Sequence, residues 1–187
     1  MTLPRSLADL LDSVVPADDK ERAVLELLRA HGASLAEPFA RHQPVAHFTG
    51  SALVTDGERV ALVLHRKLGR WLQPGGHAEP GDAGDLVRTA LREVKEETGL
   101  TVRLHPSALR PLDVDVHTIP ARGDAPAHLH LDVRFLVLAE GDTSLVVDPA
   151  ESSELGWFTL AEAMERADDP SLRRLLDKAR LHLQRSG

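Results

Sequence analysis

Residues 92–100 read Arg92-Glu93-Val94-Lys95-Glu96-Glu97-Thr98-Gly99-Leu100. With the apolar residues before them, they predict an amphipathic helix from about Asp85 to Thr98, which Gly99 ends. On a helix that turns about 100° per residue, Glu93, Glu96 and Glu97 fall at about 0°, −60° and +40°. The three carboxylates therefore share one face of the predicted helix.

A shared carboxylate face has two interpretations. It can be a solvated surface with i,i+4 ion pairs. It can also hold a cation, because two like charges 4 Å apart repel by about 4 kcal/mol at an effective dielectric near 20. The upstream loop favours the second interpretation, since Gly75-Gly76 lets the backbone approach a metal or a phosphate closely. An oxygen-only ligand set selects a hard ion, Mg²⁺ (or Mn²⁺).

The glycine loop and the helix together resemble the Nudix box of the Nudix hydrolase family. In that pattern a Gly is followed after five residues by Glu and, after seven more, by R-E-U-x-E-E-x-G-U, in which U is apolar. Residues 92–100 match every specified position of the second half. In the first half, counted from Gly76, Asp82 stands in place of Glu, and nine residues (83–91) follow it instead of seven.

The resemblance extends over about residues 46–165 and implies a fold and an activity. The fold is α/β (α+β), a Nudix-type α/β/α sandwich with a mixed sheet. The activity is metal-dependent hydrolysis of a diphosphate linkage by attack of water at phosphorus. Implied substrates are nucleoside diphosphate derivatives, such as nucleoside triphosphates, nucleotide sugars, ADP-ribose or CDP-alcohols.

The resemblance also assigns roles to individual residues of the box. It implies that Glu93 and Glu97 are metal ligands and that the Gly76 carbonyl binds the same ion. It makes Glu96 a ligand or the base for the attacking water. Arg92 would orient the carboxylates by charge-assisted hydrogen bonds. The upstream acid of the pattern is mainly structural.

Residues outside the box are expected to complete the site. The family often adds an acid upstream of a tryptophan such as Trp157; Glu151 is preferred for this catalytic role, with Glu154 as the alternative. Arg66 and His77 lie beside the box in sequence and are expected to contact phosphate. These expectations rest on sequence proximity.

Aromatic residues are few, with no Tyr, two Trp and four Phe. Trp71, in the loop before the glycines, is the residue expected to be exposed and to stack on a base. The other aromatics considered, which lie in strand patterns, are expected to pack in the core: Phe48, Phe135, Trp157 and Phe158.

Histidines and acids alternate on two predicted strands, so they share one sheet face. One strand carries Asp113, Asp115 and His117, and the other carries His128, His130 and Asp132. Either this face is solvated, or it lines the substrate cleft. In the second case His128 and His130 contact phosphate or a leaving group, or join a second metal.

Composition narrows the class of protein. The 187 residues carry a net charge of −7, which argues against binding of a nucleic acid polymer. No apolar run is long enough for a membrane helix, and the start lacks a signal-peptide core, so we expect a cytoplasmic protein with a small-molecule diphosphate substrate. For its assembly, a homodimer is one alternative.

Two other activities are compatible with a fold of this kind. A catalytically silent Nudix-like domain that binds or senses a nucleotide usually loses box carboxylates, whereas all three are present here. The isopentenyl diphosphate isomerase branch of the same fold relies on a cysteine, and this chain has none. Hydrolysis is therefore the favoured activity.

Before the box, residues 1–44 are predicted to form a helical arm packed on the hydrolase domain of residues 45–187. Its second helix is expected to begin after Asp18 and to stop at Gly32. Strands are expected at 48–55, 59–64, 101–104, 112–118 and 128–139, with a glycine- and proline-rich loop at 72–82. Trp157-Phe158 is expected in a short strand or turn, followed by helices to about Ala167 and over about 171–184.

Overall fold

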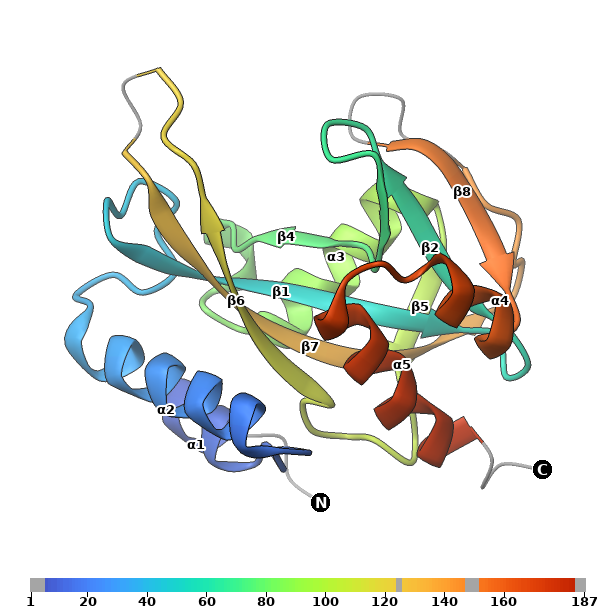
Figure 1. The fold of residues 1–187 in the computed structure, drawn as a ribbon, viewed down its shortest axis with the longest axis horizontal. Helices are drawn as coiled ribbons and strands as arrows, with labels where there is room; N and C mark the ends of the chain where they lie inside the picture. Colours follow the sequence, from blue (N-terminus) through green and yellow to red (C-terminus); the bar gives the residue numbers. More distant parts are fainter. Residues whose placement is uncertain (1–5, 124–125, 147–151, 184–187) are drawn as a thin grey trace.

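The computed structural model describes residues 6–123, 126–146 and 152–183, which form a mixed eight-stranded sheet with helices on both faces (Figure 1). The helices are α1 (Leu7–Asp12), α2 (Asp19–Ser34), α3 (Leu86–Thr98), α4 (Leu160–Arg166) and α5 (Pro170–Leu183). The strands are β1 (Ala46–Thr55), β2 (Val60–His65), β3 (Arg70–Leu72), β4 (Gly75–His77), β5 (Thr101–Leu104), β6 (Asp113–Ile119), β7 (His128–Glu140) and β8 (Ser152–Phe158). The predicted fold class is confirmed.

The long strand β1 organises the sheet. It pairs in parallel with β7 along its whole length, from Ala46 to Thr55. Its other edge is divided, because residues 54–55 pair with β2 and residues 49–51 pair with β4. Strands β3 and β8 add to β2, whereas β5 and β6 add to β7. The three-residue β4 therefore lies at an edge, beside the amino-terminal half of β1.

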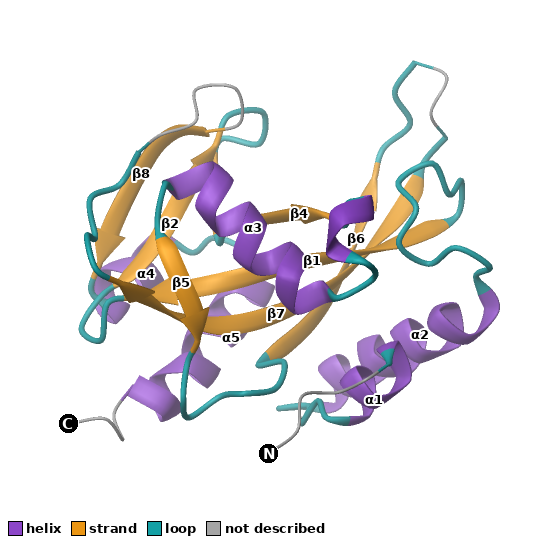
Figure 2. Cartoon of the chain, turned by 180° about the vertical axis from the view of Figure 1, so that it is seen from behind, coloured by secondary structure: helices purple, strands orange, loops and turns teal. Residues whose placement is uncertain are grey.

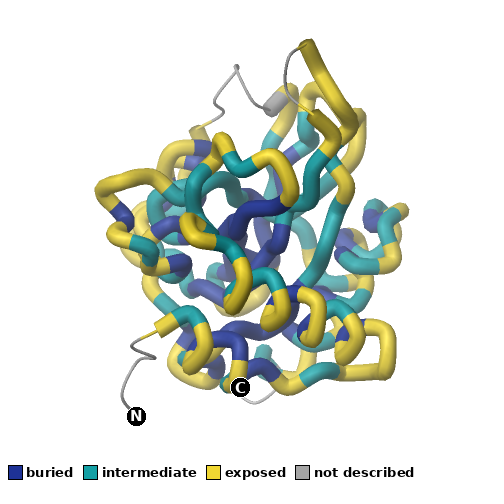
Figure 3. The backbone as a smooth tube through the Cα atoms, turned by 90° about the vertical axis from the view of Figure 1, so that its left-hand side faces the viewer, coloured by how far each residue is buried: buried dark blue, intermediate teal, exposed yellow. Residues whose placement is uncertain are grey.

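Helix α3 covers one face of the sheet, and α4 and α5 cover the other (Figures 1 and 2). Gly50 of β1 makes the close approach of α3 possible, since a Cβ there would lie 2.7 Å from the Leu86 carbonyl oxygen. Phe48, Leu86 and Val94 belong to the core under α3. The core under α5 includes Leu53, so apolar contacts hold both layers. Figure 3 shows the buried backbone running through the middle of the molecule.

The amino-terminal helices share the α3-side core. Ser6 and Asp18 cap α1 and α2 by accepting hydrogen bonds from backbone N–H groups, and Leu28 is fully buried. The expected stop at Gly32 is wrong, because α2 continues to Ser34. A Cβ on Gly32 would lie 3.2 Å from Cδ2 of Leu7, so this glycine lets α1 pack closely against α2.

The box helix begins and ends as expected. Asp85 caps α3 by accepting from two backbone N–H groups, and Gly99 ends it at φ 76°. The expected loop at 72–82 is wrong in part, since it contains β4 and a 3₁₀ turn at Pro80–Asp82. Thr159 caps α4 with a capping box formed with Glu162. No helix in the described ranges is both long and apolar enough to cross a membrane.

Candidate active site

The carboxylate face of α3 lies against β4. Glu97 is buried, and its Oε1 accepts a 2.9 Å hydrogen bond from the Gly75 N–H. A Cβ on Gly76 would lie 2.7 Å from the carboxylate of Glu93. Only a residue without a side chain leaves room for that carboxylate, so the glycines of β4 position the acids of the helix.

Arg92 joins these acids to the loop. Its Nη1 donates to Glu93 at 3.0 Å and to Glu96 at 2.9 Å. Its Nη2 donates to the His77 carbonyl oxygen at 2.7 Å and to Asp82 at 3.0 Å. Burial opposes the charge of Arg92, but the Asp82 hydrogen bond and the Glu93 charge raise its pKa above the ordinary value. A permanent cation therefore sits among the carboxylates.

Asp82 is buried at the base of the loop. Its carboxylate accepts hydrogen bonds from the Glu79 N–H, the Thr89 hydroxyl and Arg92. Burial alone would raise its pKa, but these hydrogen bonds and the Arg92 charge lower it. The loop then turns through two left-handed residues, Ala83 at φ 53° and Gly84 at φ 75°. These turns accommodate the longer loop while Asp82 still reaches Arg92.

The acids fit a hard divalent cation. Glu93, Glu96 and Glu97 offer carboxylate oxygens from one helix face, and the glycine backbone of β4 lies directly against Glu93. Glu93 is 12% exposed, whereas Glu96 is 54% exposed. Such a set of oxygen donors suits Mg²⁺ or Mn²⁺. Arg92 offsets part of the repulsion among the acids.

The polar sheet face lies on the α5 side, and its acids are buried. Arg134 of β7 pairs with Asp132 at 2.9 Å, Asp115 at 3.1 Å and Asp113 at 3.3 Å. Arg174 of α5 pairs with Asp113 at 2.7 Å. The interpretation of a solvated face is wrong for Asp113 and Asp132, which are 0% and 3% exposed. Their partner Arg134 was missed, because its contacts depend on strand pairing.

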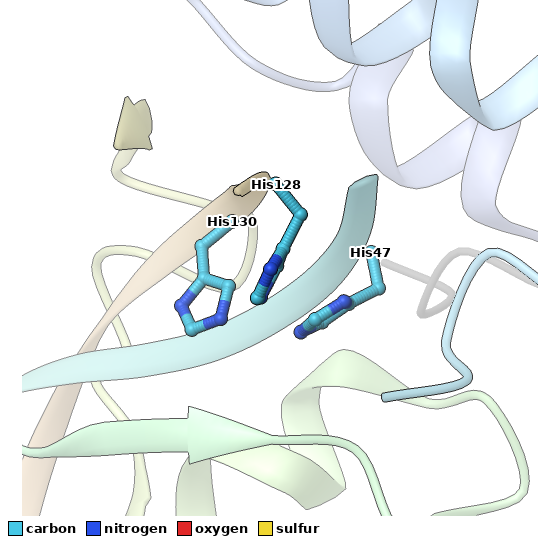
Figure 4. A group of neighbouring side chains, drawn as sticks. All are labelled: His47, His128 and His130. Atoms are coloured by element: carbon cyan, nitrogen blue, oxygen red, sulfur yellow. The ribbon is translucent and has the colours of Figure 1, made fainter. Parts of the chain in front are cut away.

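Next to this network the histidines form a cluster, which we define as His47, His77, His128 and His130. Strand pairing places His47 directly beside His130 on adjacent strands. His77 reaches the group from β4, where it pairs with Thr49. The ring centroid of His47 lies 4.7 to 5.1 Å from those of the other three. Figure 4 shows three of these rings turned toward one another.

Three members of the histidine cluster, His47, His77 and His130, have a pKa well below the ordinary value. Burial, followed by neighbouring positive charge, lowers the pKa of His47 and of His77 to about 4. The same causes lower the pKa of His130 to about 2. Nε2 of His77 lies 3.2 Å from Nε2 of His130. His47 was not predicted from sequence, since only the β1–β7 register reveals its neighbours.

The other predicted residues lie on the β2 side of the sheet or outside the described residues. Trp71 is in β3 and packs edge-on against Phe158, with centroids 5.0 Å apart, so it is half-buried rather than a free stacking surface. Arg66 is exposed on the turn after β2. Glu154 is exposed on β8, opposite Leu64. Glu151 lies outside the described residues.

Comparisons with known proteins agree with this geometry. The NUDIX domain family matches residues 47–179, well over half of the chain. A NUDIX-family hydrolase from Clostridium perfringens is 24% identical, with a TM-score of 0.53, over 79% of this chain and 99% of that chain. The C. elegans Ap4A hydrolase, as a binary complex, is 21% identical, with a TM-score of 0.51, over 73% and 97%.

A third similar structure extends over more of the chain. The NUDIX domain of Shewanella oneidensis NrtR, complexed with ADP ribose, is 19% identical, with a TM-score of 0.51. The match covers 95% of this chain and 99% of that chain. At these identities the structural likeness concerns the fold, and the domain match identifies the family. This chain therefore belongs to the Nudix hydrolase family.

Proposed function

We propose that this protein hydrolyses the diphosphate linkage of a nucleoside diphosphate derivative, with Mg²⁺ or Mn²⁺ held by the acids of α3. The ligand set comprises Glu93, Glu97 and the Gly76 carbonyl, with Glu96 as a ligand or base. An Ap4A hydrolase and a domain bound to ADP ribose are among the similar structures. Both nucleotides contain phosphoric anhydride bonds, which supports this substrate class.

The observation that carries the proposal is the position of Arg92. One guanidinium binds two acids of the helix and two groups of the upstream loop. Charge-assisted hydrogen bonds of this kind fix carboxylates in place before a ligand arrives. A solvated helix face would not be joined in this way to the upstream loop and its buried Asp82.

The chain's own residues then have distinct tasks. When bound, the metal ion neutralises phosphate charge and lowers the pKa of a water molecule. Glu93 and Glu97 each lie against β4, which restricts their side chains. They would therefore hold the metal ion in a fixed position. Glu96 is more exposed and is positioned to accept the proton of the attacking water. Water forms a bond to phosphorus, and the bridging oxygen leaves with its electron pair on the second phosphate.

Two further assignments complete the proposal. Glu151 serves as the additional acid, and Glu154 is the alternative. Residues 1–44 form the arm, while residues 45–187 form the hydrolase domain. Replacement of Glu151 and Glu154 by Gln, one at a time, distinguishes the two acids, because only the functional one lowers kcat.

The substrate class can be tested by a screen of product release. Nucleoside triphosphates, nucleotide sugars, ADP-ribose and CDP-alcohols are incubated with Mg²⁺ or Mn²⁺, and with EDTA as a control. We expect one class to be hydrolysed only with metal. In ¹⁸O-labelled water, the label should enter a phosphate product. Binding without turnover across the panel would contradict the proposal and support the sensing alternative.

A further inference from the structure

His47 is a buried imidazole that lies within about 5 Å of three other imidazole rings. Its side chain is fully buried, at 0% exposure. By distance and angle, neither Nδ1 nor Nε2 makes a well-formed hydrogen bond among the described residues; the Gln43 backbone lies near enough only to raise the pKa of His47 against the larger, opposite effect of burial. Leaving a buried polar group unsatisfied costs about 1–3 kcal/mol. A ligand that accepts a nitrogen lone pair would remove this penalty.

His128 and His130 each bring a ring nitrogen close to a ring nitrogen of His47. One ring nitrogen each from His47, His128 and His130 lie within 4.8 Å of one another (Figure 4). Nδ1 of His128 lies 2.9 Å from the Pro126 carbonyl oxygen. A carbonyl can only accept, so Nδ1 carries the proton and Nε2 keeps its lone pair. Metal-binding histidines are commonly oriented by such a carbonyl.

We propose that His47, His128 and His130 bind a second metal ion, of the Zn²⁺ class, at a site separate from the acids of α3. Three imidazoles with no carboxylate among them favour zinc or a similar transition metal over Mg²⁺. Zn–N bonds of about 2.0–2.1 Å place tetrahedral ligands about 3.3 Å apart, so small ring rotations bring the three nitrogens into position.

His77 lies beside these three ligands and is not a member of the group whose nitrogens all lie within 4.8 Å of one another. Its Nε2 is 3.2 Å from Nε2 of His130, close to the spacing expected for two nitrogens on one tetrahedral ion. A shift of its ring toward His47 and His128 would make it the fourth ligand. The low pKa values of His47, His77 and His130 keep their nitrogens unprotonated at neutral pH, as metal binding requires.

A cluster held by hydrogen bonds alone is the competing explanation. It explains the contact between His77 and His130, whose Nε2 atoms can form one hydrogen bond. It also explains the hydrogen bond from His128 to the Pro126 carbonyl oxygen. It leaves both nitrogens of His47 unsatisfied at the centre of the group. The metal site explains all four side chains, so it is the more complete explanation.

The test uses the full chain, freed of metal by a chelator and then titrated with Zn²⁺ in the absence of substrate. We expect one tightly bound equivalent, measured by calorimetry and by metal analysis after gel filtration. His128→Gln should weaken binding at least ~10²-fold, since even changes outside the ligand set cost about 10–100-fold. His42→Gln, on an exposed histidine paired with Glu37, is the matched control and should bind as wild type does.

Two further measurements separate loss of this site from misfolding of a variant and from loss of hydrolysis. Co²⁺ bound to wild-type protein should give the intense visible absorption of a four-coordinate nitrogen site, which needs no variant to fold. Glu97→Gln should retain Zn²⁺ binding, so that loss of hydrolysis and loss of this site are separable. Equal Zn²⁺ binding by wild type and a folded His128→Gln, or only weak six-coordinate Co²⁺ bands, would overturn the proposal.

Discussion

The carbonyl oxygen of His77 accepts a 2.7 Å hydrogen bond from Nη2 of Arg92. The same guanidinium binds Glu93 and Glu96 through Nη1. Strand β4 therefore has two functions within three residues. Its glycines contact the acids of α3, while the side chain of its last residue enters the histidine cluster.

Gly76→Ala should lower kcat at least ~10-fold with little loss of stability. The added Cβ would lie 2.7 Å from the Glu93 carboxylate and must displace it, and a small misplacement of a catalytic group has a large effect on rate. Steady-state kinetics and thermal melting measure the two effects. Gly81→Ala is the control, because nothing lies within 4 Å of a Cβ there. Equal loss of activity in both variants would refute the positional role.

Arg134→Met should destabilise the fold by about 3–5 kcal/mol, because it leaves buried acids without their shared cation. Chemical denaturation measures the change in the free energy of unfolding. Arg173→Met, at an exposed position on α5, should change it by less than about 0.5 kcal/mol. Near-equal stability of the two variants would show that the network contributes little.

Asp82→Asn should alter the acid side of the stability curve. The pKa of Asp82 lies below its ordinary value of 3.8 in the folded state, so it stabilises the fold above about pH 4. That contribution is lost as the pH falls through the folded pKa. The difference in unfolding free energy between wild type and Asp82→Asn should thus be largest near neutrality and shrink in acid. Asp82→Glu, which keeps the charge, should follow wild type; a difference between wild type and Asp82→Asn that is independent of pH would contradict this explanation.

Base discrimination should be weak. Every Phe and Trp ring of the chain is already packed within the protein or half-buried, including Trp71 against Phe158. A stacked base contributes roughly 1–3 kcal/mol, and no free ring is available to provide it. We expect kcat/KM to vary less than ~10-fold among adenine, guanine, cytosine and uracil forms of the preferred substrate, or about 1.4 kcal/mol. A 10³-fold preference for one base would reveal a dedicated pocket.

The box was predictable from sequence because its information is local. Helical periodicity places Glu93, Glu96 and Glu97 together, and Asp85 and Gly99 mark the ends of the helix. These features depend on residues within one helix and its caps. The alternation on β6 and β7 likewise predicted that His128, His130 and Asp132 share a face.

What sequence did not reveal depends on pairing between distant strands. His47 meets His130 only because β1 and β7 pair in parallel in one register. Arg134 was not recognised as the cation that pairs with three acids, since its partners come from β6 and from its own strand. Gly32 was misread as a stop because the contact it allows, with Leu7, is between helices.

The most direct measurement is the metal-dependent turnover of Glu97→Gln against Lys95→Gln on the substrate found in the screen. Glu97 contacts Gly75 and is proposed to hold the metal, whereas Lys95 is exposed on another face of α3. We predict that Glu97→Gln lowers kcat at least ~10²-fold with a nearly unchanged melting temperature, and that Lys95→Gln turns over as wild type does. Near wild-type turnover by a folded Glu97→Gln would contradict the assignment of the α3 acids as the catalytic metal site.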